Sequence, residues 1–112
     1  MSTESRDYVR TILDLYLRLP ETPNQSSRLD RQLALEWFKR NIPVPAVEAA
    51  FLLASARRLA RDQKATGLVR SLHYFLPVLE EVGCTPPPSS YLCYLRRKVF
   101  AAQARTGKGE AC

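Results

Sequence analysis

Cations are the residues in this chain best suited to chemistry, and they gather in two stretches. Arg57, Arg58, Arg61, Lys64 and Arg70 stand against a single acid, Asp62. Arg96, Arg97, Lys98, Arg105 and Lys108 likewise stand against Glu110 alone. Arginine and lysine side chains bind phosphate oxygens, and a nucleic-acid backbone is a continuous row of phosphates. The pattern predicts a phosphate-binding face, provided that folding brings the two stretches together.

Tyr94 stands beside the second stretch, off the apolar stripe formed by Leu92, Leu95 and Val99. Aromatic side chains next to arginine give nucleobases a surface on which to stack. We therefore expect the nucleic-acid-binding residues to be Arg57, Arg58, Arg61, Lys64, Arg70, Tyr94, Arg96, Arg97 and Lys98. The alternative is that these cations occupy solvated helix ends, where positive charge offsets the helix dipole.

Catalytic chemistry is the least supported class. His73 is the only histidine, and no serine or cysteine has an identifiable base. The three cysteines, Cys84, Cys93 and Cys112, fit no zinc-ligand spacing. We therefore expect no catalytic residue, no metal and no cofactor, so the protein is predicted not to be an enzyme. The odd number of cysteines argues against a disulfide framework and favours a reducing cytoplasm.

Composition limits the class of protein further. The chain has 112 residues, of which 46% are hydrophobic and 25% charged, as in one ordinary globular domain. Its net charge of +6 favours polyanionic partners, with nucleic acid first. No apolar run reaches the roughly 18 residues of a membrane-spanning helix, and residues 1–7 (MSTESRD) lack the apolar core of a signal peptide. We expect no membrane segment.

The elements that must position these residues are helices. Helical spacing of apolar residues predicts five of them, over residues 5–19, 27–41, 45–63, 67–83 and 91–105. Ser27 and Asp30 form a capping-box pattern at the start of the second, with Leu29, Leu33, Trp37 and Phe38 as its buried side. The predicted fold is all-α: a compact bundle of four to five short helices around one core. Residues 1–103 form this single domain, and residues 104–112 form a flexible tail.

The fourth predicted helix contains Pro77, where a helix breaker is least expected. On a helical projection Leu72, Phe75 and Leu79 lie in one apolar stripe, with Leu68 and Val82 at its ends, and Pro77 falls almost opposite. Its missing hydrogen bond is then on the solvent side, where water can replace it. The pattern predicts a core helix kinked at Pro77, with His73 off the stripe.

The stretch WFKRNIPVPAV (37–47) has the outline of a helix-turn-helix motif. Its second helix would open with Val44, Pro45, Ala46 and Glu48, which are poor readers of base edges, and Glu48 would repel phosphate. A plain corner between two helices is the favoured interpretation.

Two stretches, RLDRQLALEWFKRNIPVPAVEAAFLLASARRL and VRSLHYFLPVLEEV, together resemble small uncharacterised helical proteins of bacterial mobile genetic elements, found near transposase or replication genes. The order of elements across residues 28–82 also resembles the DnaD-like helical domains of replication initiators and helicase loaders. The resemblance implies a role in DNA transactions, and assigns no individual residue.

These observations favour a non-enzymatic accessory protein of a mobile element, acting in replication, in transposition or as a ribonucleoprotein subunit. It is expected to bind the phosphate backbone of DNA or RNA through a basic face. The alternative is a helical adaptor that docks on a recombinase, helicase or effector nuclease, because five short helices carry more apolar surface than a small core hides. A protein partner from the same element is expected, and self-association stays open.

Overall fold

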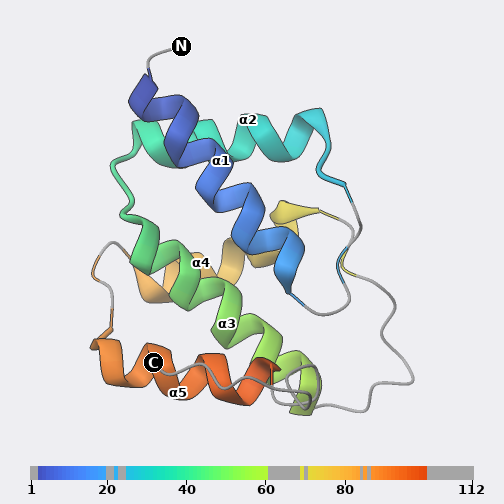
Figure 1. Cartoon of the computed structure of the whole chain (residues 1–112), viewed down its shortest axis with the longest axis vertical. Helices are drawn as coiled ribbons and strands as arrows, with labels where there is room; N and C mark the ends of the chain where they lie inside the picture. The colour runs from blue at the N-terminus through green and yellow to red at the C-terminus, as the bar shows by residue number, and fades with distance from the viewer. Residues whose placement is uncertain are drawn as a thin grey trace.

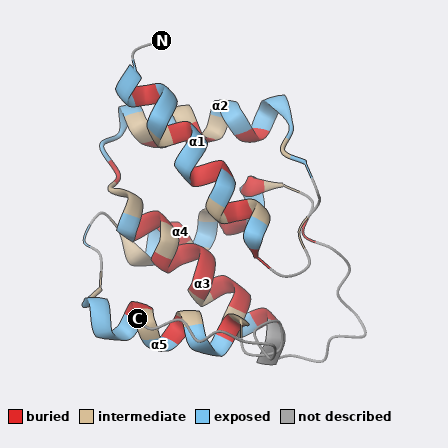
Figure 2. Cartoon of the chain, in the orientation of Figure 1, coloured by how far each residue is buried: buried red, intermediate tan, exposed pale blue. Residues whose placement is uncertain are grey.

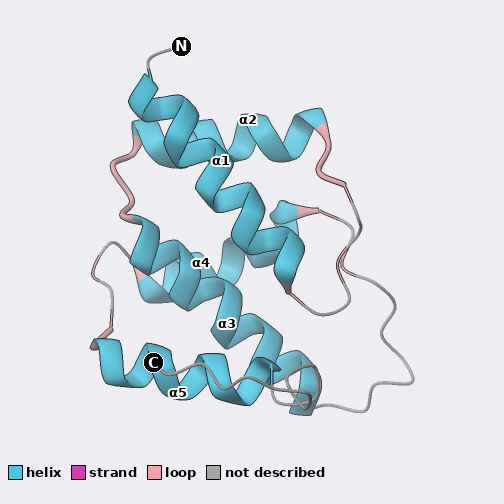
Figure 3. Cartoon of the chain, in the orientation of Figure 1, coloured by secondary structure: helices cyan, strands magenta, loops and turns pink. Residues whose placement is uncertain are grey.

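The computed structural model describes residues 3–19, 22, 25–60, 69, 71–83, 85 and 87–100, with the side chains of residues 59 and 60 excepted. Over these residues the chain forms five α-helices and one 3₁₀ helix, and no strand (Figures 1 and 3). Their bounds are α1 Thr3–Arg18, α2 Arg28–Lys39, α3 Val44–Ala60, η2 Leu72–Phe75, α4 Leu76–Val82 and α5 Ser89–Phe100. The predicted all-α bundle is confirmed, and the predicted tail lies outside the described residues.

Helix α3 is the centre of the bundle, because it contacts α1, η2, α4 and α5. Figure 1 shows α1 and α2 at one end of the molecule and α5 at the other, with α3 running between them. Three small residues of α3, Ala49, Ala50 and Ala54, are buried and let its neighbours approach closely. A helix surrounded in this way has no broad polar face (Figure 2).

Large aromatic side chains from four elements fill the core. Tyr16 of α1, Trp37 of α2, Phe51 of α3 and Phe75 of η2 are all fully buried. The ring centroids of Phe51 and Phe75 lie 4.8 Å apart, and the ring of Tyr16 meets that of Phe75 edge-on with a centroid distance of 6.0 Å. Such pairs add about 0.5–1.5 kcal/mol each beyond the burial of their area. The aromatic cluster therefore ties the N-terminal helices to the middle of the chain.

The capping box predicted at the start of α2 is present. The hydroxyl of Ser27 accepts the N–H of Asp30, and the Asp30 carboxylate accepts the N–H of Ser27 at 2.9 Å. The other carboxylate oxygen accepts the N–H of Leu72 at 3.0 Å, which lies 42 residues further along the chain. Burial, and then the charge of Asp30, raise the pKa of Tyr16 to about 12. One buried carboxylate thus starts α2 and holds η2 against it.

The predicted buried side of α2 is only partly right. Trp37 is buried and Leu33 and Phe38 are half-buried, but Leu29 is 61% exposed. The reason is the capping box, which turns Asp30 toward the core. Its neighbour Leu29 then points about 100° away, into solvent.

The single helix predicted over residues 67–83 is wrong, because the described part of that stretch holds two helices. Leu72–Phe75 form a 3₁₀ turn, and α4 begins at Leu76, with Pro77 in its first turn. A helical N–H is not needed there, so the proline starts a helix instead of bending one. Pro77 has no N–H to donate to the carbonyl of His73, and that carbonyl instead accepts the N–H of Leu76. Leu72, Phe75 and Leu79 are buried, and Pro77 and His73 are exposed, as the pattern predicted.

Candidate nucleic-acid interface

The first predicted basic stretch is only partly described. Arg61, Lys64 and Arg70 lie outside the described residues, which leaves Arg57 and Arg58 at the end of α3; we call these two the α3 cluster. Arg57 forms a bidentate ion pair with Glu81 of α4, with both N–O distances at 2.9 Å. These hydrogen bonds raise the pKa of Arg57 and lower the pKa of Glu81. Glu81, although its side chain is 52% exposed, therefore ties α4 to α3.

Arg58 points inward. Only 7% of its surface is exposed, and its guanidinium carbon lies 5.5 Å from the ring centroid of Tyr74. At that distance the cation is attracted by the face of the ring. A buried guanidinium is poorly placed to reach phosphates in solvent, so Arg58 acts in packing.

The second basic stretch lies on α5, and Arg96 is also held by the fold. Its guanidinium binds both carboxylate oxygens of Glu48, at 2.9 and 3.0 Å, and this raises the pKa of Arg96. The Glu48 side chain is 17% exposed, so the pair is partly shielded from water. The acid expected to repel phosphate therefore joins α3 to α5. The corner predicted within residues 37–47 is a separate feature, a short turn between α2 and α3.

Arg97 and Lys98 are exposed, and helix α5 (Ser89–Phe100) contains no acidic residue. Within the described part of the chain, no carboxylate lies within 4 Å of either side chain. Among the described residues, Arg97 donates a hydrogen bond to the sulfur of Cys93, at 3.9 Å. No carboxylate of the described residues neutralises either cation, so both charges are available to a ligand.

Two tyrosines lie on the same helix as these cations. Tyr94 is 51% exposed, as predicted, and Tyr91 is 42% exposed. Their rings are nearly parallel, at 23°, with centroids 6.1 Å apart, and the Lys98 ammonium is 6.0 Å from the centre of the Tyr94 ring. We call Tyr91, Tyr94, Arg97 and Lys98 the α5 stripe. The sequence singled out Tyr94 and passed over Tyr91, although a spacing of three residues places both on one side of a helix.

The sequence left open whether the two basic stretches form one face. Helices α3 and α5 do pack together, so their described cations lie on neighbouring elements. The fold nevertheless leaves only some of these cations available to bind a ligand. Arg57 and Arg96 are ion-paired and Arg58 is buried, whereas the α5 stripe is exposed.

Cys93, in the second turn of α5, is disulfide-bonded. This differs from the expectation drawn from the odd number of cysteines. Three cysteines leave one thiol over, but they do not prevent a single bridge. The cysteine count therefore gives no support to a reducing compartment.

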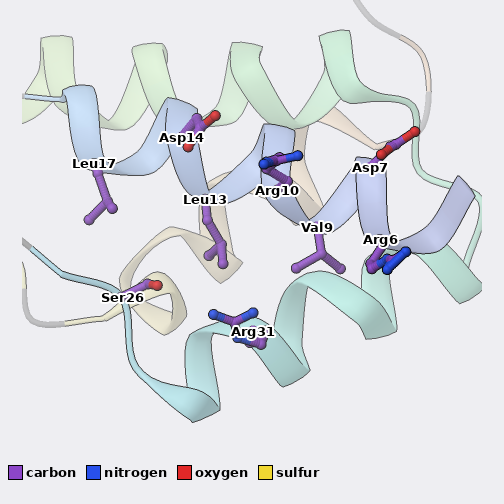
Figure 4. Close-up of a pocket in the computed structure, with 9 residues that line it drawn as sticks. All are labelled: Arg6, Asp7, Val9, Arg10, Leu13, Asp14, Leu17, Ser26 and Arg31. Carbon is purple, nitrogen blue, oxygen red and sulfur yellow. The ribbon is translucent and has the colours of Figure 1, made fainter. Parts of the chain in front are cut away.

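A second candidate site is a cavity of about 540 Å³ between α1 and α2 (Figure 4). Val9, Leu13 and Leu17 point toward α2 in Figure 4, whereas Asp7 and Asp14 point away from it. Its lining carries charges of both signs, from Arg6, Arg10 and Arg31 and from Asp7 and Asp14. Val9 and Leu13 are only 4% and 6% exposed, so they offer a ligand little apolar area. This cavity is a weaker candidate than the α5 stripe.

Among the described residues, no group of three histidine, cysteine, aspartate or glutamate side chains is placed to hold a metal ion. None of the helices in that part of the chain is long and apolar enough to cross a membrane. Comparison with known proteins found no family model that matches the chain, and no curated protein or solved structure that resembles it.

Proposed function

We propose that the protein is a non-enzymatic nucleic-acid-binding protein that contacts the phosphate backbone through the α5 stripe. The observation that carries the proposal is the exposure of Arg97 and Lys98 beside two tyrosines, on a helix without acids. Such cations release counterions when they bind phosphates, and the net charge of +6 adds a general attraction to polyanions. DNA and RNA share this chemistry.

The biological setting that we propose is the cytoplasm, as an accessory protein of a bacterial mobile element. It rests on the resemblance of residues 28–82 to such proteins. A role in replication, in transposition or in a ribonucleoprotein would each need backbone binding. The identity of the neighbouring genes tests this setting: transposase or replication genes support it, and unrelated metabolic genes oppose it.

The test of the binding proposal is a titration of fluorescent single strands and duplexes at several salt concentrations. We expect a dissociation constant in the non-specific range of about 10⁻⁴–10⁻⁶ M. Two phosphate contacts predict a log–log salt slope of about −1.4 on a single strand. No binding at low salt, or binding unaffected by added salt, rejects the proposal.

A matched pair of variants separates the stripe from net charge. The double substitution Arg97→Gln with Lys98→Gln removes two cations from α5, and Arg6→Gln with Arg10→Gln removes two from α1. We expect the first to weaken binding several-fold and to flatten the salt slope, and the second to have little effect. Equal losses show that only the net charge matters.

A protein-adaptor role is the second candidate. Leu29 is 61% exposed on α2, and it borders a groove of about 420 Å³ that Leu33 and His73 also line. Leu29 is the apolar side chain of this groove that is most open to solvent, so we place the docking contact there. Replacing Leu29 with glutamine should abolish capture of a product of a neighbouring gene, with Tyr94→Gln, a comparably exposed side chain on α5, as the control. If both variants capture the partner equally, Leu29 is not the docking position.

A further inference from the structure

The α5 stripe leads into a small groove at its N-terminal end. A cavity of about 230 Å³ lies among α3, α4 and the start of α5. Leu53, Val82 and Pro87 give it apolar walls, and Tyr91 borders it. It is smaller than the roughly 300–1,000 Å³ of pockets that take drug-sized ligands. A single flat ring system suits its size.

Tyr91 belongs to both the groove and the stripe. It borders the groove and also lies nearly parallel to Tyr94, whose ring is followed by the Lys98 ammonium. From Tyr91 to Lys98 is about 10 Å along the helix axis, on the order of three stacked nucleotides at 3.4 Å each. A strand whose phosphates contact Arg97 and Lys98 therefore has a base within reach of the groove.

One polar group of the groove is suited to the edge of a base. Glu81 lines the cavity, and each of its carboxylate oxygens accepts one hydrogen bond from Arg57. A carboxylate oxygen can accept more than one hydrogen bond, so Glu81 keeps acceptor capacity. The exocyclic amino group of cytosine is a donor that a glutamate accepts. The ion pair with Arg57 also holds this carboxylate in place.

We propose that the groove binds one nucleobase of a single strand, stacked on Tyr91, while the phosphates follow Arg97 and Lys98. This inference rests on the proposed backbone binding and makes the protein selective for single strands. In a duplex the bases are paired and stacked inside the helix, so neither Tyr91 nor the groove can reach a base face. Bases gain by stacking on tyrosine whatever their sequence, and Glu81 adds a preference for amino-bearing bases.

The experiment compares two ligands that differ only in their bases. A fluorescent dC12 strand and a 12-mer of abasic deoxyribose phosphate are titrated against the wild type at pH 7.5 and low salt. We expect dC12 to bind about tenfold more tightly, a factor within the range that one stacked base supplies. The same titration with rC12 separates RNA from DNA as the source of the strand.

Variants locate the base. Tyr91→Ala should weaken dC12 binding about tenfold and leave abasic binding unchanged, whereas Tyr91→Phe keeps the ring and most of the affinity. Thr85→Trp fills the groove from an exposed position and should have the effect of Tyr91→Ala. Tyr74→Ala is the control, because Tyr74 is 38% exposed on η2 and lies outside the stripe.

The outcomes distinguish the two proposals. If dC12 and the abasic strand bind equally, or if Tyr91→Ala weakens both alike, the base site is rejected and backbone binding stands. If neither strand binds at low salt, backbone binding itself is rejected. Duplex binding as tight as dC12 binding also rejects the base site.

Discussion

The cations of the α3 cluster and those of the α5 stripe differ in what folding does with them. Arg57 is ion-paired to Glu81 and Arg58 is buried against Tyr74, whereas Arg97 and Lys98 stay exposed with no carboxylate nearby in the described part of the chain. In the sequence the two groups look alike, because each belongs to a stretch with several cations and a single acid. The difference teaches that the acids that decide whether a cation is available come from other elements, here from α4.

Helix α5 contains the same contrast within three residues. Arg96 faces α3 and is held by Glu48, while Arg97 lies about 100° further round the helix and faces solvent. An acid-free helix is therefore not sufficient for an exposed cation. Its orientation in the bundle decides which arginine serves the fold and which one serves a ligand.

The largest expected effect is the difference in stability between an alanine variant of a buried arginine, Arg58, and one of an exposed arginine, Arg97. Arg58→Ala should lower the free energy of unfolding by about 2 kcal/mol, because it removes a buried stem and its contact with Tyr74. Arg97→Ala should change it by less than about 0.5 kcal/mol. Urea denaturation measures both values. Equal losses would remove the distinction between the two groups.

An intermediate effect is expected when Arg96 is released. Glu48→Gln should cost about 1 kcal/mol of stability, because it breaks a partly shielded pair. The freed guanidinium adds a third unpaired cation to α5, so binding to a single strand should strengthen and its salt slope should steepen by about 0.7.

The control for this experiment is Glu36→Gln, which makes the same change of charge on the exposed side of α2. It should leave the salt slope as it is. A rise in affinity as large as that of Glu48→Gln would mean that the whole net charge, and not Arg96, is responsible.

The smallest effect concerns the pH dependence of the tie between α3 and α4. The hydrogen bonds from Arg57 lower the pKa of Glu81 from its ordinary value of 4.5. A depressed carboxyl pKa contributes stability above the ordinary value and loses it as the pH falls through the lowered value. The stability difference between wild type and Glu81→Gln should therefore be constant from pH 7 to about pH 5 and shrink below pH 4.5. Urea unfolding at each pH measures it, and a difference that grows at low pH contradicts the pairing.

Much of the fold could be predicted because its signals are local. The capping box at Ser27, the helical spacing of Leu72, Phe75 and Leu79, and the position of Tyr94 off its apolar stripe each depend on residues a few places apart. The all-α class follows from the same kind of pattern. Where the structure has two helices in place of the predicted kinked helix, the break lies beside Pro77, at which the sequence predicted the kink.

The candidate site was less predictable because it depends on distant pairs. Arg57 meets Glu81 across 24 residues and Arg96 meets Glu48 across 48, and no local pattern contains such distances. The burial of Arg58 was hidden for another reason. Helix α3 is packed by four elements, so its sequence has no clear polar side from which an inward arginine would stand out.

The carboxylate of Asp30 has a consequence for how the molecule opens. The amide of Leu72 is bonded to a side chain at the start of α2 and not to a carbonyl of its own helix. That amide can exchange its hydrogen with solvent only when the contact between η2 and α2 breaks. Its exchange rate is therefore a reporter, placed in the second half of the sequence, of the opening of a helix in the first half.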